Sequence, residues 1–393
     1  MISEEHTKYL IGNYAPPTIE IVRGLGTKLW DSDGKEYLDF ASGIAVTNIG
    51  HGHPAWIDRV TEQSTVLAHA SNLYSIPEQI RLAKRLVERI GPGKVLFCNS
   101  GAEANEAMIK LSRLVAHQSE EQERLEILVA ENAFHGRTMG ALSATASSKY
   151  RKGFEPLLPG FRFATFNRAE SFRETVTELS RAIMLESIQG EGGIHTASDE
   201  FLRDIENLCA EKKLLLLLDE VQAGIGRTGE FLGFQASGIR PSAVAMAKGL
   251  GGGFPLGALW VAEEFAETFQ PGSHGTTFGG SPLACSAANA VLDVLETENL
   301  IEKTREHGSY FQSKLEELKT RFPSQVSEIR GRGLMLAIAM QNDPSPAIKA
   351  MREEGLLVVA AAGRALRLLP PLTVSRKELD EALVIIERVL SQS

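Results

Sequence analysis

Several features that mark other classes of protein are scarce or missing in this chain of 393 residues. It has only three cysteines (Cys98, Cys209 and Cys285), whose scattered positions give neither a disulfide framework nor zinc-ligand spacing. No apolar run approaches the ~18 residues needed to span a bilayer. The opening residues MISEEHTKYL lack the basic start and apolar stretch of a signal peptide. With neither HExxH nor a Walker lysine loop present, these absences favour a cytoplasmic protein and disfavour zinc-protease and P-loop sites.

The chain also lacks an excess of basic over acidic residues. The net charge of -9 and the pI near 5.6 disfavour nucleic acid or an anionic membrane as the main partner. The apolar content of 43% and the charged content of 23% are ordinary for a globular protein. The length predicts one large or two ordinary domains with ample core.

Strand and helix patterns alternate through the middle of the chain. Short apolar strands are predicted at 95–100, 125–132, 181–187, 214–220 and 242–248, with a helix at 102–116. This alternation indicates an α/β fold with a mostly parallel sheet covered by helices on both faces. A small hairpin region is expected at 18–40. After residue 296, a charged helix (299–320), two apolar segments and a last helix (375–391) predict a compact α+β domain.

An acid and a lysine stand at the ends of two strong strand patterns. The run LLLLL ends in Asp219, and 29 residues later the run AVAMA ends in Lys248. If these strands are parallel neighbours, both side chains lie at the same edge of the sheet, where open α/β sheets bind ligands. A carboxylate facing a lysine suits pyridoxal phosphate, because the lysine forms a Schiff base and the acid keeps the pyridine nitrogen protonated.

A second candidate is the turn NSGAEAN (99–105) between a predicted strand and helix. Gly101 permits a tight turn, after which the free N–H groups of the helix start can bind phosphate. The alternative is an ordinary turn with Ser100 as helix cap. The presence of Asp219 and Lys248 favours the phosphate site.

The segment 224–229 matches the dinucleotide fingerprint G-x-G-x-x-G. Residues 219–223 separate it from the preceding strand, and no acid follows about 20 residues later to bind a ribose. We therefore interpret it as a glycine-rich surface loop, which weakens the case for a nicotinamide dehydrogenase.

Other candidate residues are ambiguous when taken alone. Phe134 and Arg137 follow a strand and could stack on a planar cofactor and bind a carboxylate, or be a core ring and a solvated charge. Glu186 and Glu191 flank the loop after another strand. Arg367 lies in an apolar strand, where it needs a partner or a ligand carboxylate.

Two further patterns are compatible with plain structural roles. The hydroxyls of Thr276 and Thr277 could contact phosphate, although such a small-residue loop is often only a turn. His51 and His53 have no third or fourth metal ligand in the pattern, and we interpret them as structural.

The motifs NSGAEANE, FHGR, GEGG, DEVQAGIGRTG, AKGLGGGFPLGA, HGTTFGG and LRLLPPL, in this order, resemble the class III (omega-) aminotransferases. The N-terminal text and FHGR resemble the acetylornithine/ornithine branch, and the resemblance covers nearly the whole chain. It implies PLP-dependent transferase fold type I. A large domain (51–295) would carry a mostly parallel seven-stranded sheet. A smaller α+β domain would combine the C-terminal part (296–393) with the N-terminal segment (1–50).

The resemblance also implies how pyridoxal phosphate is held. Lys248 would form the Schiff base and shuttle the proton, Asp219 would pair with the pyridinium nitrogen, and Gln222 would contact the phenolic oxygen. Phe134 would stack on the ring. The phosphate would be bound by Gly101, Ala102 and, from the partner subunit of a homodimer, Thr277.

Substrate binding follows from the same resemblance. Arg137, with Thr276 nearby, would bind the α-carboxylate of the acetylated substrate. Arg367 would bind the α-carboxylate of 2-oxoglutarate or glutamate, and Glu191 would act as a gate that pairs with Arg367. Ser187 stands where the family usually has proline, which affects the local loop shape rather than the chemistry.

The implied activity is transfer of the δ-amino group of N2-acetyl-L-ornithine to 2-oxoglutarate, giving N-acetylglutamate semialdehyde and glutamate for arginine synthesis. The alternative is another omega-aminotransferase acting on ornithine, succinylornithine, succinyldiaminopimelate or carrier-bound lysine, or the semialdehyde aminomutase branch. A non-catalytic binding protein would not need Lys248 opposite Asp219.

Overall fold

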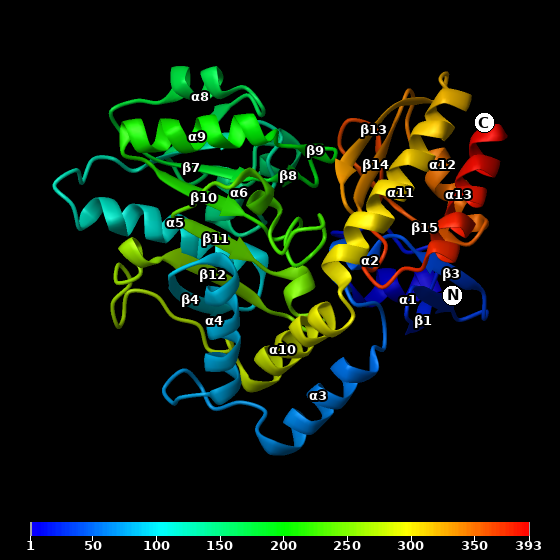
Figure 1. Ribbon diagram of the computed structural model, residues 1–393, viewed down its shortest axis with the longest axis horizontal. Coiled ribbons are helices and arrows are strands. Elements are labelled where there is room, and N and C mark those ends of the chain that lie inside the picture. The colour runs from blue at the N-terminus through cyan, green and yellow to red at the C-terminus, as the bar shows by residue number, and fades with distance from the viewer. Residues whose placement is uncertain (1, 393) are drawn as a thin grey trace.

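The computed structural model describes residues 2–392, and its largest element is a seven-stranded sheet (Figure 1). The strand order is β4-β12-β11-β10-β7-β5-β6. β12 is antiparallel to both neighbours, whereas β11, β10, β7, β5 and β6 pair in parallel, so the predicted mostly parallel sheet is confirmed. The strands are β4 (Gly93–Cys98), β5 (Glu126–Ala130), β6 (Phe161–Ala164), β7 (Ser180–Glu186), β10 (Leu215–Asp219), β11 (Ala243–Met246) and β12 (Gly257–Ala262).

Helices cover both faces of this sheet because its strands are apolar on both sides. Along β10, Leu215 and Leu217 pack in a cluster with α5, whereas Leu216 and Leu218 pack in a cluster with α4, α9 and α10. The helices of this part are α3 (Pro54–Val66), α4 (Pro77–Ile90), α5 (Gly101–His117), α6 (Met139–Ala144), α7 (Ser148–Arg151), α8 (Ala169–Thr175), α9 (Asp199–Lys212) and α10 (Pro282–Thr297).

Short elements complete the loops of this part. They are the strand pair β8 (Ile188–Gln189) and β9 (His195–Thr196) and the 3-10 helices η1 (Gly233–Ser237), η2 (Lys248–Leu250) and η3 (Glu263–Phe265). The connection from β10 to β11 contains η1 and no α-helix, so strict alternation of strand and helix fails at this one crossover.

The C-terminal part and the N-terminal segment share a sheet. β3 pairs in parallel with β15, in the order β1-β2-β3-β15. A second four-stranded sheet has the order β13-β14-β17-β16. The strands are β1 (Ile21–Leu25), β2 (Lys28–Asp31), β3 (Glu36–Asp39), β13 (Val326–Arg332), β14 (Met335–Met340), β15 (Leu356–Leu357), β16 (Val359–Ala361) and β17 (Ala365–Leu368).

Helices of this second part are α1 (Ile2–Tyr9), α2 (Ser42–Ala45), α11 (Leu300–Arg321), α12 (Ser345–Glu353) and α13 (Arg376–Ser391). Figure 1 shows the blue N-terminal strands beside the red and orange C-terminal elements. The domain boundaries at 50/51 and 295/296 stay a proposal, and the second falls near the end of α10.

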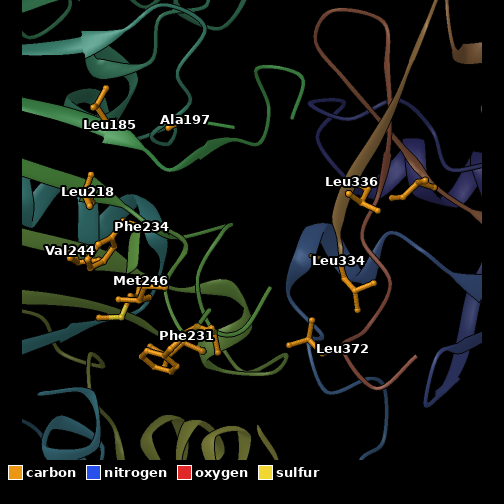
Figure 2. Close-up of a cluster of buried hydrophobic side chains, with 14 of the residues drawn as sticks. Leu185, Ala197, Leu218, Phe231, Phe234, Val244, Met246, Leu334, Leu336 and Leu372 are labelled. Atoms are coloured by element: carbon orange, nitrogen blue, oxygen red, sulfur yellow. The ribbon is translucent and has the colours of Figure 1, made fainter. Parts of the chain in front are cut away.

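One apolar cluster joins the two parts. It includes Leu218 and Met246 from the large sheet and Leu334, Leu336 and Leu372 from the C-terminal part. Figure 2 shows these side chains lying on both sides of the seam between the parts. The loops at this seam therefore rest on one continuous core.

The loop 224–229 is buried, so our interpretation of it as a surface loop is wrong. Arg227, within this loop, is fully buried and donates hydrogen bonds to Asn48 Oδ1 (2.7 Å), Leu334 O (3.2 Å) and Pro370 O. The loop is thus a bridge between the large sheet and the C-terminal part, which the local pattern does not reveal.

Candidate active site

The carboxyl ends of three parallel strands converge on one cavity. β7 ends in Glu186, β10 in Asp219, and Lys248 follows β11. All three residues line a cavity of about 440 Å³, together with the start of α5 and the segment after β5. The prediction that Asp219 and Lys248 share a sheet edge is therefore confirmed by the register of β10 and β11.

Asp219 is held by a network of three donors. Its Oδ2 accepts hydrogen bonds from Asn105 Nδ2 (2.7 Å) and His135 Nδ1 (2.8 Å), and its Oδ1 accepts one from Val221 N (3.0 Å). The side chain is 5% exposed. Because donors on both sides fix the carboxylate, it presents a constant orientation to whatever occupies the cavity.

Lys248 occupies a strained position. Its φ of 45° lies in the left-handed region, which costs a non-glycine residue on the order of 1–3 kcal/mol. Desolvation is the largest cause of its lowered pKa, to which the positive charge of Arg367 adds, while Glu191, Asp219 and Glu186 oppose the shift. A lysine whose pKa is lowered reaches the neutral, nucleophilic form more readily.

Glu186 and Glu220 are buried carboxyl groups beside Asp219. Burial, aided by the charge of Asp219, raises the pKa of Glu186 well above its ordinary value. Burial also raises the pKa of Glu220 to about 7, although the backbone N–H groups of Gly233 and Phe234 donate to its carboxyl group. Both carboxyl groups beside Asp219 therefore take the neutral form more readily than an exposed glutamate does.

The start of α5 opens onto the cavity. Ser100 caps the helix, accepting a hydrogen bond from Glu103 N (3.2 Å), as in the alternative interpretation of this turn. Gly101 and Ala102 line the cavity, and as the first helical residues their N–H groups have no partner within the helix. A Cβ on Gly101 would lie 2.5 Å from Val221 Cγ1, so only glycine allows Val221 this close to the helix start.

The segment after β5 places aromatic rings beside an arginine. Phe134 lines the cavity and packs edge-on against Tyr150 with ring centroids 5.6 Å apart. The guanidinium of Arg137 lies 3.9 Å from the centroid of the Tyr150 ring. This stacking holds an exposed arginine at the cavity rim with its N–H edges free to bind a carboxylate.

Arg367 lies behind the cavity wall rather than on it. It is 1% exposed and does not line the cavity; its Nη1 donates to Glu191 Oε1 (2.6 Å) and Gln222 Oε1 (2.9 Å). The pairing of Glu191 with Arg367 matches the pairing that we predicted. The contact with Gln222 was not predicted, because 145 residues separate these two positions.

Thr276 and Thr277 lie outside the cavity of this single chain. Thr276 Oγ1 accepts hydrogen bonds from Asn99 Nδ2 (3.1 Å) and Gly279 N (3.2 Å), and Thr277 is exposed. The substrate contact of Thr276 and the phosphate contact of Thr277, which would come from a partner subunit, stay predictions.

Ser187 and the histidine pair have structural surroundings. Ser187 is buried, and its carbonyl oxygen accepts a hydrogen bond from Ala197 N (2.9 Å). His51 Nε2 lies 2.8 Å from Asp39 Oδ2, and His53 Nε2 lies 2.9 Å from Glu298 Oε1. These contacts connect the N-terminal segment with neighbouring elements.

The cavity fits a planar phosphorylated pyridine. It offers a fixed buried carboxylate, a half-buried lysine, an aromatic ring and an open helix start in one space. His135 Nε2 is buried without a hydrogen-bond partner in the described structure, a further polar group at the cavity wall. This set of donors, acceptors and apolar walls matches the requirements of pyridoxal phosphate.

Three residues of the site were not predicted from the sequence. Asn105 and His135 support Asp219, and Tyr150 supports Arg137. Asn105 lies in the motif NSGAEAN and His135 lies in FHGR. Their positions next to candidate residues could have identified them. Nothing in the local sequence marks Tyr150.

Comparison with known proteins agrees with this geometry. Residues 11–390 match the family model of class-III aminotransferases. The chain is 47% identical over 386 residues to the acetylornithine aminotransferase of Caldanaerobacter subterraneus subsp. tengcongensis, with 98% of each chain covered. It is 45% identical over 383 residues to that of Aquifex aeolicus, covering 97% of this chain and 100% of the relative. The solved ornithine aminotransferase of Toxoplasma gondii ME49 superposes with a TM-score of 0.95 at 30% identity, covering 99% of this chain and 94% of that structure.

Proposed function

The chain belongs to the class-III aminotransferase family and is a pyridoxal-phosphate-dependent enzyme, and we propose that it transfers the δ-amino group of N2-acetyl-L-ornithine to 2-oxoglutarate. The products would be N-acetyl-L-glutamate 5-semialdehyde and L-glutamate, in arginine biosynthesis. The observation that carries this proposal is the pair of unlike arginine sites at the cavity that Lys248 lines. Arg137 is exposed at the rim, whereas Arg367 is buried and covered by Glu191.

The residues that would hold the cofactor are those whose positions were described above. Bound pyridoxal phosphate supplies a carbonyl group that takes up the amino group and a ring that delocalises electrons. Asp219 would keep the ring nitrogen protonated, and Lys248 would bind the cofactor covalently. The remaining contacts would come from Gly101, Ala102, Phe134, Gln222 and Thr277 of the partner subunit.

Lys248 would also move the proton. Its Nζ would accept the proton from the substrate carbon that bears the amino group and later give it up again. The lowered pKa of Lys248 favours the neutral amine required for this step. Three donors to the Asp219 carboxylate fix its orientation, so it would meet the ring nitrogen in a constant position.

Two substrates must use one site in turn. The amine-bearing end of acetylornithine has no carboxylate, so Arg367 would be an uncompensated buried charge unless Glu191 covered it, at a cost of several kcal/mol. Glutamate and 2-oxoglutarate carry an α-carboxylate at the reacting end, which would replace Glu191. Arg137 would bind the α-carboxylate of acetylornithine, with Thr276 nearby.

A second cavity supports a donor with a group beyond the carboxylate. It has a volume of about 410 Å³ and shares Phe134 with the catalytic cavity. Tyr150, on which Arg137 stacks, also lines it, so it lies just past the proposed carboxylate site. An N2-acyl group would be accommodated there, whereas an unsubstituted amine such as GABA would leave it empty.

The proposed assembly is a homodimer with shared sites. Large apolar side chains stay exposed at the end of α3, in the loop that follows it, at the start of α4 and beside Thr277: Val66, Leu73, Tyr74, Ile80 and Phe278. Apolar patches of this kind mark protein–protein contacts. Burial of this surface by a second subunit would bring Thr277 to the partner's phosphate site.

We propose the cytoplasm as the location, because the three cysteines are free and buried, as in proteins of reducing compartments. Among the described residues, no helix has the length and apolar character needed to cross a membrane. Small molecules, rather than nucleic acid or membrane, are the expected ligands of this acidic chain.

A panel of amino donors tests the function. Acetylornithine, succinylornithine, ornithine and GABA are each supplied with 2-oxoglutarate, and glutamate formation is measured. We expect the highest kcat/KM for acetylornithine. A higher kcat/KM for another donor would mean that the enzyme is the omega-aminotransferase that acts on that donor. Lys248→Ala serves as the inactive control, and borohydride reduction followed by peptide mass analysis should place the cofactor on Lys248 in the unmodified enzyme only.

A further inference from the structure

The guanidinium of Arg367 is held by two side chains that meet at one nitrogen. Nη1 donates to both Glu191 and Gln222, whereas the buried Nε has no hydrogen-bond partner in the described structure. The edge of the guanidinium that includes Nε can therefore bind a ligand carboxylate. The hydrogen bonds at Nη1 hold the guanidinium in position.

The two anchoring side chains differ in freedom. Glu191 has a side chain that is 22% exposed and lines the second cavity, so it can turn toward solvent. Gln222 is 7% exposed and lines the catalytic cavity. Its amide packs against Gly190 so tightly that a Cβ on Gly190 would lie 2.4 Å from Gln222 Oε1 and 2.5 Å from its Nε2.

We propose that Gln222 is a positioning residue for Arg367: it is the fixed, neutral partner that keeps the guanidinium in place while Glu191 moves away. This role rests on the proposed function, in which Arg367 binds the carboxylate of 2-oxoglutarate or glutamate. It is separate from any contact that Gln222 makes with the cofactor.

The chemistry of the two side chains explains the division of roles. A carboxylate neutralises the guanidinium and must leave before a substrate carboxylate binds. An amide oxygen accepts a hydrogen bond from the same nitrogen without cancelling its charge, so it can remain through both half-reactions. Without the amide, the uncovered guanidinium would lose its only described side-chain partner besides Glu191.

The position of Arg367 behind Gln222 adds a constraint on specificity. Arg367 does not line the catalytic cavity, whereas its partner Gln222 does. The distance from Arg367 to a bound carboxylate therefore depends on the position of the Gln222 side chain. Gly190 packs against the same amide and so limits where it can lie. Substitutions at either position should therefore act on the reaction through Arg367.

Three single substitutions in the holoenzyme test the proposal: Gln222→Glu, Gln222→Met and Gly190→Ala. Single-turnover spectra measure the half-reaction with glutamate and, separately, the half-reaction with the best ω-amino donor of the unmodified enzyme. The donor is chosen by measurement, so an error in the proposed donor does not affect this test. Binding of a non-reacting dicarboxylate and cofactor retention, followed by fluorescence, provide readouts other than turnover.

Gln222→Glu places a second carboxylate on Arg367, and we expect the ratio of glutamate to ω-amine reactivity to fall by roughly 10- to 100-fold, as for loss of a charge-assisted contact. Gln222→Met and Gly190→Ala should lower the same ratio by about ten-fold and weaken dicarboxylate binding. In an Arg367→Leu background, Gln222→Met should cause no further fall in the ratio.

Equal losses in both half-reactions, with cofactor retention lost in parallel, would show that Gln222 serves the cofactor alone and would overturn the proposal. A further glutamate-selective loss in the Arg367→Leu background would also overturn it, because Gln222 would then act without Arg367. If Gln222→Glu folds poorly, Gly190→Ala decides the test, because it changes neither the Gln222 nor the Arg367 side chain.

Discussion

Two arginines are among the largest fully buried side chains of this protein, and their surroundings differ in kind. Arg227 donates to two backbone carbonyls and one asparagine oxygen, and burial lowers its pKa to about 9. Arg367 donates to a glutamate and a glutamine side chain beside the catalytic cavity.

The difference separates a structural charge from a functional one. Backbone carbonyls cannot leave without unfolding the segments that carry them, so Arg227 is fixed between the large sheet and the C-terminal part. The carboxylate of Glu191 can rotate away, so the charge of Arg367 can be exposed to a ligand. A buried charge is thus available for chemistry only where a partner is mobile.

The largest expected effect is on stability, at Arg227. Arg227→Met leaves Asn48 Oδ1 and the carbonyls of Leu334 and Pro370 without their donor. We expect the free energy of unfolding to fall by on the order of 4 kcal/mol, the usual cost of breaking a buried polar network. Urea unfolding monitors the loss, with Arg367→Leu as the matched buried control, for which about 1–2 kcal/mol is expected. Similar losses for the two variants would remove the distinction between them.

The next effect is on catalysis, at Arg367. Arg367→Leu should slow the half-reaction with glutamate by roughly 100- to 1000-fold, or about 3–4 kcal/mol, because the carboxylate loses its charged partner. The half-reaction with acetylornithine should change far less, since its reacting end carries no carboxylate. Single-turnover spectra measure each half alone. Equal losses in both halves would contradict the assignment.

The same contrast applies to buried acids and gives a pH dependence. Glu220 is held by backbone N–H groups, and burial raises its pKa to about 7 from an ordinary value of 4.5. The stability that this group contributes is complete below pH 4.5 and is lost as the pH rises through 7, because the folded state must then ionise a buried carboxyl group.

Glu220→Gln stays neutral, so it should gain stability relative to the unmodified protein between pH 5 and pH 8, by up to about 3 kcal/mol. Urea unfolding at the two pH values measures this difference. Glu88→Gln, at a side chain that is 58% exposed, serves as the control. A pH-independent difference for Glu220→Gln would mean that Glu220 is ionised throughout this range.

The smallest effect sharpens the role of the mobile partner. Glu191→Ala leaves Arg367 uncovered, so glutamate should react relatively faster and acetylornithine relatively slower. We expect a change of about ten-fold in the ratio of the two rates, which corresponds to about 1.4 kcal/mol. Competition between the two donors measures the ratio. An unchanged ratio would refute gating by Glu191.

The sequence by itself determined much of this protein. Apolar runs ending in Asp219 and Lys248 defined two strands and one shared sheet edge, because parallel strands present their carboxyl ends on the same side. The cap at Ser100, the long helix after residue 299 and the family motifs were equally local. Each of these features depends on patterns of a few residues, which backbone geometry converts directly into structure.

Only the tertiary structure decided which side chains and strands meet over long distances in the sequence. The contacts of Arg227 with Pro370, of Arg367 with Gln222 and of β3 with β15 join positions more than 140 residues apart. The burial of the loop 224–229 also depends on the C-terminal part packing over it. Such pairings follow from how complete elements pack in three dimensions, and a local pattern of residues carries no record of the partner it will bind.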